Sequence, residues 1–162
     1  MRNLYVSLLF GLVLLTWSLA SAANWAQQTV TFEVQAIDEM SVSGNPAALI
    51  VSTATAGSEP DAATNNATTY ALTTNGTNKK ITGAINSAMP ANTTLEVSLT
   101  APTGGSSLGS VGLSAVDADL VTGITQKAES GLTITYTLSA TVSAGIVASD
   151  SRTVTLTLTA GA

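Results

Sequence analysis

The chain has 162 residues, with 10 acidic and 5 basic side chains, a net charge of −5, and neither Cys nor His. The lack of Cys excludes disulfides and thiolate metal sites, and the lack of His removes the commonest general base and metal ligand. So few basic residues could not neutralise a run of phosphates, so a nucleic-acid partner is excluded as well.

The N-terminus has the pattern of a secretory signal. Arg2 provides a positive start, residues 6–15 are apolar, and the small residues Ala20 and Ala22 precede a cleavage point. We interpret residues 1–22 as a cleaved signal peptide. An uncleaved membrane anchor is the alternative, but the apolar run is short for a hydrocarbon core of about 30 Å. Cleavage predicts a secreted protein, extracellular or at the cell surface, with periplasmic transit in a Gram-negative host.

The remaining residues, 23–162, are predicted to form one domain that begins with a strand pattern. Val30, Phe32 and Val34 alternate with polar neighbours. A period of two is typical of a half-buried β-strand. Residues 47–51 follow as a short apolar run. The same alternation recurs further on, at Leu95, Val97 and Leu99.

The pair Asn75-Gly76 separates two further apolar patterns. Tyr70 and Leu72 precede it, and Ile81 and Ile85 follow it. Both turn residues tolerate a positive φ, which is a strong hairpin signal. The sequence therefore predicts an antiparallel hairpin at this turn.

The clearest strand signal covers residues 132–142. Apolar and Thr or Ser residues alternate strictly there, and Val154, Leu156 and Leu158 repeat the pattern near the C-terminus. We expect these two strands to form a hairpin around residues 143–151. With about eight or nine strands and no convincing helix after residue 22, the sequence predicts an all-β antiparallel sandwich.

The polar residues give little sign of catalysis or metal binding. Asp117 and Asp119 are two apart in a loop-like stretch and could present oxygens to calcium, but calcium loops normally gather more ligands. The favoured interpretation is a pair of solvated acids, with no metal and no other cofactor. A serine or threonine nucleophile would have only Lys79, Lys80 or Lys127 as a base, so the protein is not expected to be an enzyme. Three N-glycosylation sequons start at Asn66, Asn75 and Asn92.

The predicted strands carry no charges that would protect exposed edges. Residues 97–116 and 130–149 contain no charged side chain. Soluble β proteins usually block their edges with Lys, inward charges or Pro. Two interpretations stay open: the edges are short or covered, or one edge receives a strand from another chain by β-augmentation.

The C-terminal residues 131–159 resemble the closing hairpin of bacterial pilin-like subunits. They are most similar to the spore-coat-U and archaic chaperone–usher group, in which the last strand often reads as alternating Thr and Val, here Thr153-Val-Thr-Leu-Thr-Leu-Thr159. The resemblance implies an incomplete immunoglobulin-like sandwich that a neighbour's N-terminal strand completes, and an export chaperone as a partner. This chain differs from that group in lacking a Cys pair.

We therefore expect a non-catalytic structural subunit of an extracellular filament, pilus or surface coat, with copies of itself as the partner. Residues 23–36 are the predicted donor strand, with Trp25, Val30, Phe32 and Val34 at the subunit interface. A secreted adhesin or carbohydrate-binding module is the alternative, and a spacer domain of a larger envelope assembly is a third hypothesis. Two strands are candidates for the acceptor edge, residues 132–142 and 154–158.

Overall fold

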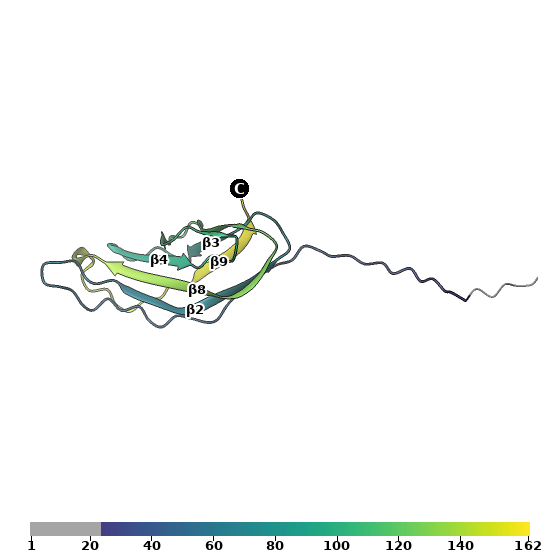
Figure 1. The fold of residues 1–162 in the computed structure, drawn as a ribbon. Coiled ribbons are helices and arrows are strands. Elements are labelled where there is room, and N and C mark those ends of the chain that lie inside the picture. Colours follow the sequence, from purple (N-terminus) through teal and green to yellow (C-terminus); the bar gives the residue numbers. More distant parts are fainter. Residues whose placement is uncertain (1–23) are drawn as a thin grey trace, which may run out of the picture. The chain divides into compact units, whose positions relative to one another are not determined.

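The computed structural model describes residues 24–162, which form two antiparallel β-sheets and no α-helix (Figure 1). The compact part is Val34–Ala162, a unit distinct from the one that ends at Glu33. The predicted signal peptide, residues 1–22, lies outside the described residues. Over residues 24–162, no helix has the length and apolarity needed to cross a membrane.

The first sheet has five strands and contains the longest strands of the domain. Strand β8 occupies its centre and pairs with β2 on one side and β4 on the other, as Figure 1 shows. The alternation predicted over residues 132–142 is confirmed for Leu132, Ile134 and Tyr136 of β8, which are buried. It is wrong at its end, because the strand stops at Ala140 and Val142 is 67% exposed in a 3-10 turn. The order across the sheet is β1 (Asp38–Val42), β2 (Ala63–Thr74), β8 (Lys127–Ala140), β4 (Thr93–Leu99) and β6 (Val111–Gly112).

The second sheet has four strands, and its last member, β9, pairs with β3 and with no other strand of residues 24–162. Its order is β5 (Ser106–Ser107), β7 (Ala118–Ile124), β3 (Lys79–Ile85) and β9 (Val154–Ala160). The described residues form nine strands, and the sequence predicted about eight or nine.

Both sheets contribute to one hydrophobic core, which is the arrangement of a β-sandwich. Each fully buried aliphatic or aromatic side chain contributes about 1.5–3 kcal/mol, as an upper bound, because its apolar surface leaves water. The first sheet supplies Tyr70, Leu72, Leu95, Val97, Leu99, Leu132, Ile134 and Tyr136, and the second supplies Ile81, Ile85, Leu120, Val121 and Ile124.

The predicted hairpin at Asn75-Gly76 is wrong. Strand β2 belongs to the first sheet and β3 to the second, so the turn carries the chain across the core. Both strands place one apolar row inward, and the two rows face each other between the layers. The Asn75 side chain bonds residues 35–37 instead of closing a two-strand turn.

The predicted hairpin of the last two strands is wrong for the same reason. Strand β8 lies in the first sheet and β9 in the second. The intervening residues, which include the 3-10 turn Val142–Ala144, again cross between layers. Residues 29–35 and 47–51 form no strand, since no described segment pairs with their backbone.

Candidate functional site

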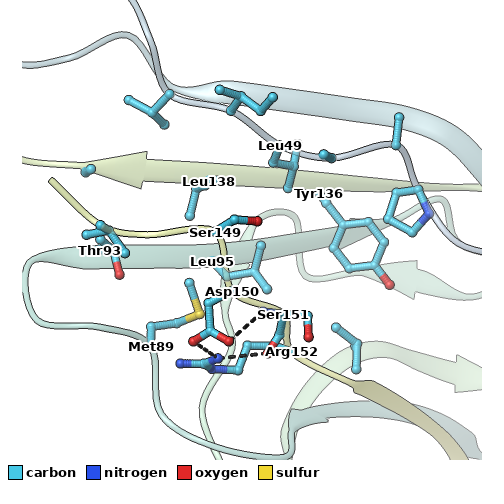
Figure 2. A pocket seen from close by; sticks show the side chains of 18 of the residues that line it. Leu49, Met89, Thr93, Leu95, Tyr136, Leu138, Ser149, Asp150, Ser151 and Arg152 are labelled. Atoms are coloured by element: carbon cyan, nitrogen blue, oxygen red, sulfur yellow. Dashed lines mark hydrogen bonds and ion pairs between the residues drawn. The ribbon is translucent and has the colours of Figure 1, made fainter.

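A long groove opens between the two sheets at the side where β1 and β9 lie. It has a volume of about 1450 Å³ and is drawn in Figure 2. Residues 44–54, which follow β1, form one wall, and residues 147–156, which lead into β9, form the other. All its lining residues belong to the unit Val34–Ala162.

The floor of the groove is apolar and consists of core side chains. Leu95 and Leu138 reach it from β4 and β8, as Figure 2 shows. On β9, Val154 and Leu156 are only partly buried, although they alternate in the same way as the buried row of β8. The core of the domain is therefore uncovered along this side.

Both walls have backbone groups without backbone partners. Among the described residues, neither 44–52 nor 147–152 makes a backbone-to-backbone hydrogen bond. The outer edge of β9 is likewise unpaired by any described strand. A row of free N–H and C=O groups beside an apolar floor is the surface that an added β-strand requires.

Arg152 holds the rim of the groove at the start of β9. Its guanidinium donates to the carbonyl of Ala88 from Nε at 3.0 Å and from Nη2 at 2.9 Å, and to Asp150 Oδ2 from Nη1 at 2.6 Å. Figure 2 shows the bond to Asp150. The hydrogen bond from Arg152 lowers the pKa of the Asp150 carboxyl, and a bond from the Ser151 N–H adds to this effect. The rim is thus tied to the loop that precedes β4.

The lining also contains hydroxyl groups, among them those of Thr68 and Tyr136. Thr68 is 5% exposed, and its Oγ1 is buried without a hydrogen-bond partner. The Tyr136 hydroxyl also has no partner among the described residues, whereas the Tyr70 hydroxyl donates to the carbonyl of Thr100 at 2.6 Å. Burial raises the pKa of both tyrosines, so each stays a neutral hydroxyl.

A second cluster holds the chain where it enters β1. Asn75 Oδ1 accepts from the N–H of Ile37 at 2.9 Å, and its Nδ2 donates to the carbonyl of Gln35 at 2.7 Å. Lys79 Nζ and Thr74 Oγ1 each donate to the Asp38 carboxylate at 2.6 Å. These contacts, which we call the Asn75 clamp, fix residues 35–38 at the β2–β3 turn.

The predicted interface residues lie on an extended segment that precedes this clamp. Over residues 24–37 the backbone forms no strand. Trp25 is 66% exposed, Val30 73%, Phe32 89% and Val34 80%. Four large apolar side chains are therefore in contact with water, and three of them alternate on one side of an extended chain.

The two calcium candidates are not part of a larger ligand cluster. Asp117 is exposed just before β7. Asp119, within β7, forms an ion pair with Lys80, in which Asp119 Oδ1 and Lys80 Nζ are 2.8 Å apart. In the part of the chain that the structure describes, no three acidic residues come together to hold a metal ion.

The sequon asparagines differ in accessibility. Asn66 is exposed on β2, while the Asn75 side chain is occupied in the clamp. The Asn92 side chain donates to the carbonyl of Ser143 at 3.2 Å.

The sequence predicted an acceptor edge beside residues 132–142 or 154–158. Strand β8, which covers most of the first range, pairs with β2 and β4 on its two edges, whereas β9, in the second range, has an edge that no described strand pairs. The opposite wall, residues 44–54, was not predicted, because it has no alternating pattern and is about a hundred residues away in the chain.

No protein-family model matches the chain, and the searches among curated proteins and solved structures found no match.

Proposed function

We propose that the protein is a non-catalytic structural subunit of an extracellular filament, pilus or surface coat. Each copy would place residues 23–36 as a β-strand in the groove of the next copy. The observation that carries the proposal is the uncovered groove beside the unpaired edge of β9, in a chain that also has an exposed, alternating apolar segment.

The strand order supports an immunoglobulin-like assignment with one position open. Such domains pair strands A, B, E and D in one sheet and strands C, F and G in the other. Here β1, β2, β8 and β4 follow the order A, B, E and D, and β3 beside β9 follows the order C and F, while β6 and the pair β7 and β5 extend the two sheets at their other edges. No described strand occupies the position of G beside β9, and a donated strand would fill it.

The donor segment matches the groove in polarity and charge. Residues 24–32 carry no charge, Glu33 lies in the row opposite Phe32, and the groove floor is mainly apolar. Val30, Phe32 and Val34 would face the floor, and each would contribute about 1.5–3 kcal/mol on full burial. Trp25 stands in the opposite row of a regular strand, so it would contact the rim of the groove instead of its floor.

An unpaired apolar edge also requires cover before assembly. Long, uncharged edges associate with one another nonspecifically. An export chaperone that covers the same groove until a donor strand replaces it is therefore a partner that this proposal expects.

The test compares residues 23–162 with a variant that lacks residues 23–36. Each protein is concentrated and examined by size-exclusion chromatography with light scattering and by negative-stain electron microscopy. We expect filaments or ladders of oligomers from the first and only monomers from the second. If both stay monomeric at high concentration, the proposal is wrong.

Point variants distinguish specific strand donation from nonspecific hydrophobic association. Phe32→Asp places a charge on the proposed donor row and should abolish assembly, because a buried unpaired carboxylate is costly. Val116→Asp is the matched control, since Val116 is also exposed, at 74%, but lies outside both the donor segment and the groove. Equal loss of assembly in both variants would contradict a specific role for residues 23–36.

A further inference from the structure

Asn75 is followed by a glycine, and in this context an asparagine side chain reacts readily with the main chain next to it. Asn75-Gly76 is the only Asn-Gly pair in the sequence. Glycine has no Cβ to shield its N–H or to restrict its backbone, so its nitrogen can approach the neighbouring side-chain amide. Asparagine is also one of the chemically labile residues of proteins. The β2–β3 turn therefore contains a reactive pair within the Asn75 clamp.

The reaction of this pair is the loss of ammonia through a succinimide ring. The Gly76 nitrogen gives up its proton and bonds to Asn75 Cγ, and the Cγ–Nδ2 bond breaks as ammonia leaves. Water then opens the ring. Its attack at Cγ gives aspartate, and its attack at the main-chain carbonyl carbon gives isoaspartate, in which the backbone runs through Cβ and Cγ. Water is the only co-reactant, and both side-chain hydrogen bonds of Asn75 are exposed to it.

The clamp opposes the first step of this reaction. The Asn75 amide is fixed at both of its polar atoms, by the N–H of Ile37 at 2.9 Å and the carbonyl of Gln35 at 2.7 Å. The Gly76 N–H is occupied as well, because it donates to Thr74 Oγ1 at 3.0 Å. Ring closure requires a side chain that can turn and a nitrogen that can lose its proton. The reaction therefore depends on opening of the clamp.

The product cannot restore the clamp. Asparagine offers an acceptor oxygen and a donor NH₂ group, whereas an aspartate carboxylate only accepts. Its second oxygen would face the carbonyl oxygen of Gln35, to which Nδ2 now donates, in a turn that already holds the Asp38 carboxylate. Isoaspartate also lengthens the backbone of a turn whose main chain bonds Ile37 and Gln126. Once converted, the turn stays open.

We propose that Asn75 is a site of spontaneous deamidation, that opening of the Asn75 clamp sets its rate, and that conversion permanently releases residues 35–37 from the β2–β3 turn. These residues connect the exposed apolar segment to the domain. The modification is a one-way loosening of the base of that segment. The inference does not depend on strand donation, because the reactive pair and the clamp belong to one subunit.

The experiment follows the conversion of each asparagine by peptide mapping and mass spectrometry. The full chain is expressed, recovered after export and incubated in mildly alkaline buffer, either folded or unfolded in urea. Asn75 should convert in both samples, and about five- to tenfold more slowly in the folded one, because the clamp is closed in most molecules. Asn66 is the internal control: it is exposed on β2, is followed by Ala67, and should stay unconverted.

Ile37→Pro weakens the clamp without changing the reactive pair. Proline has no N–H, so Asn75 Oδ1 loses its partner and conversion in the folded protein should rise about threefold. Val34→Pro is the matched control, since Val34 is 80% exposed and its N–H bonds no described residue. Circular dichroism checks that both variants fold. If Ile37→Pro does not fold, the variant that lacks residues 23–36 replaces it, because that deletion removes the carbonyl of Gln35.

The consequence for the turn is measured on the converted protein. Ion exchange separates it, because conversion adds a negative charge. Hydrogen exchange of the amides of residues 37–42 should be faster than in the parent, while that of β8 should not change. Equal conversion in the folded and unfolded chain, or in the two proline variants, would contradict control by the clamp. A folded chain that leaves Asn75 intact, or a converted form with unchanged exchange, would overturn the proposal as well.

Discussion

Strands β8 and β9 have nearly the same sequence pattern and very different surroundings. Both alternate apolar residues with Thr or Ser. Strand β8 pairs on both edges, and Ile134 in its inward row is 1% exposed, whereas β9 pairs on one edge and its inward row is only partly buried. Alternation thus identifies a strand and its inward face, and the neighbours of the strand decide how much that face contributes to stability.

The largest effect is expected at the centre of β8. Ile134→Ala should lower the free energy of unfolding by about 2–5 kcal/mol, because it leaves a cavity in a fully packed core. The measurement is a urea titration. Ile146→Ala is the control, since Ile146 is fully exposed and the same change there should cost less than about 0.5 kcal/mol. Similar losses for the two variants would contradict the packing described here.

A smaller effect is expected on β9. Leu156→Ala should lower the stability of the unassembled subunit by about 1–2 kcal/mol, because Leu156 is only partly buried. Under the proposed function, the same change should weaken the assembled form more strongly, since a donated strand would complete the burial of Leu156. Urea titrations below and above the assembly concentration check this difference. A loss as large as that of Ile134→Ala in the unassembled subunit would remove the contrast between the two strands.

The two Asn75 hydrogen bonds of the clamp should contribute about 1 kcal/mol together, because both are exposed to water. Asn75→Ala removes the bonds to Ile37 and Gln35. Hydrogen exchange of the amides of residues 37–42 should become faster, while that of β8 should not change. Asn66→Ala is the control, because Asn66 is exposed on β2, the strand that ends just before Asn75, and its side chain makes no hydrogen bond with a described residue.

The smallest effect on stability is expected from the charge of the Asp38 carboxylate. The pKa of the Asp38 carboxyl lies below its usual value of 3.8, because Lys79 and then Thr74 donate hydrogen bonds to it. Because the pKa is lowered in the folded state, the stabilisation that the charged Asp38 carboxylate provides is complete above about pH 4. It is lost as the pH falls through the pKa of the folded state. Asp38→Asn should therefore flatten the pH dependence of stability below about pH 4 and leave the dependence between pH 5 and 8 unchanged, as urea titrations across the pH range would show.

The sequence predicted the strands better than their partners. Alternation is a local property, so β8 and β9 could be recognised from their own residues. The sheet to which each belongs depends on distant contacts: the turn Asn75-Gly76, which has a good hairpin signal, and the loop 143–151 between two similar patterns both connect different sheets. The two-residue strands β5 and β6 are too short to produce a pattern.

The candidate site has two parts, the exposed apolar segment and the groove, and they were predicted to different degrees. The exposed apolar row of residues 30–34 follows directly from alternation, and its role in assembly stays a prediction. On the groove side, β9 follows from alternation as well, but the irregular wall of residues 44–54 opposite it is brought there only by the folded chain. The orphan hydroxyl of Thr68 could not be predicted, because Thr residues fill both faces of β2 and only the packing shows which of them lacks a partner.

Under the proposed function, the bonds from Arg152 to Ala88 and Asp150 have a consequence for strand entry. They stiffen the entrance of the groove before any occupant arrives. A receptor that is already ordered loses little conformational entropy when it is filled, so the free energy of the new contacts goes into affinity. Entry would then be limited by the ordering of the incoming segment and by the frequency of encounters between chains.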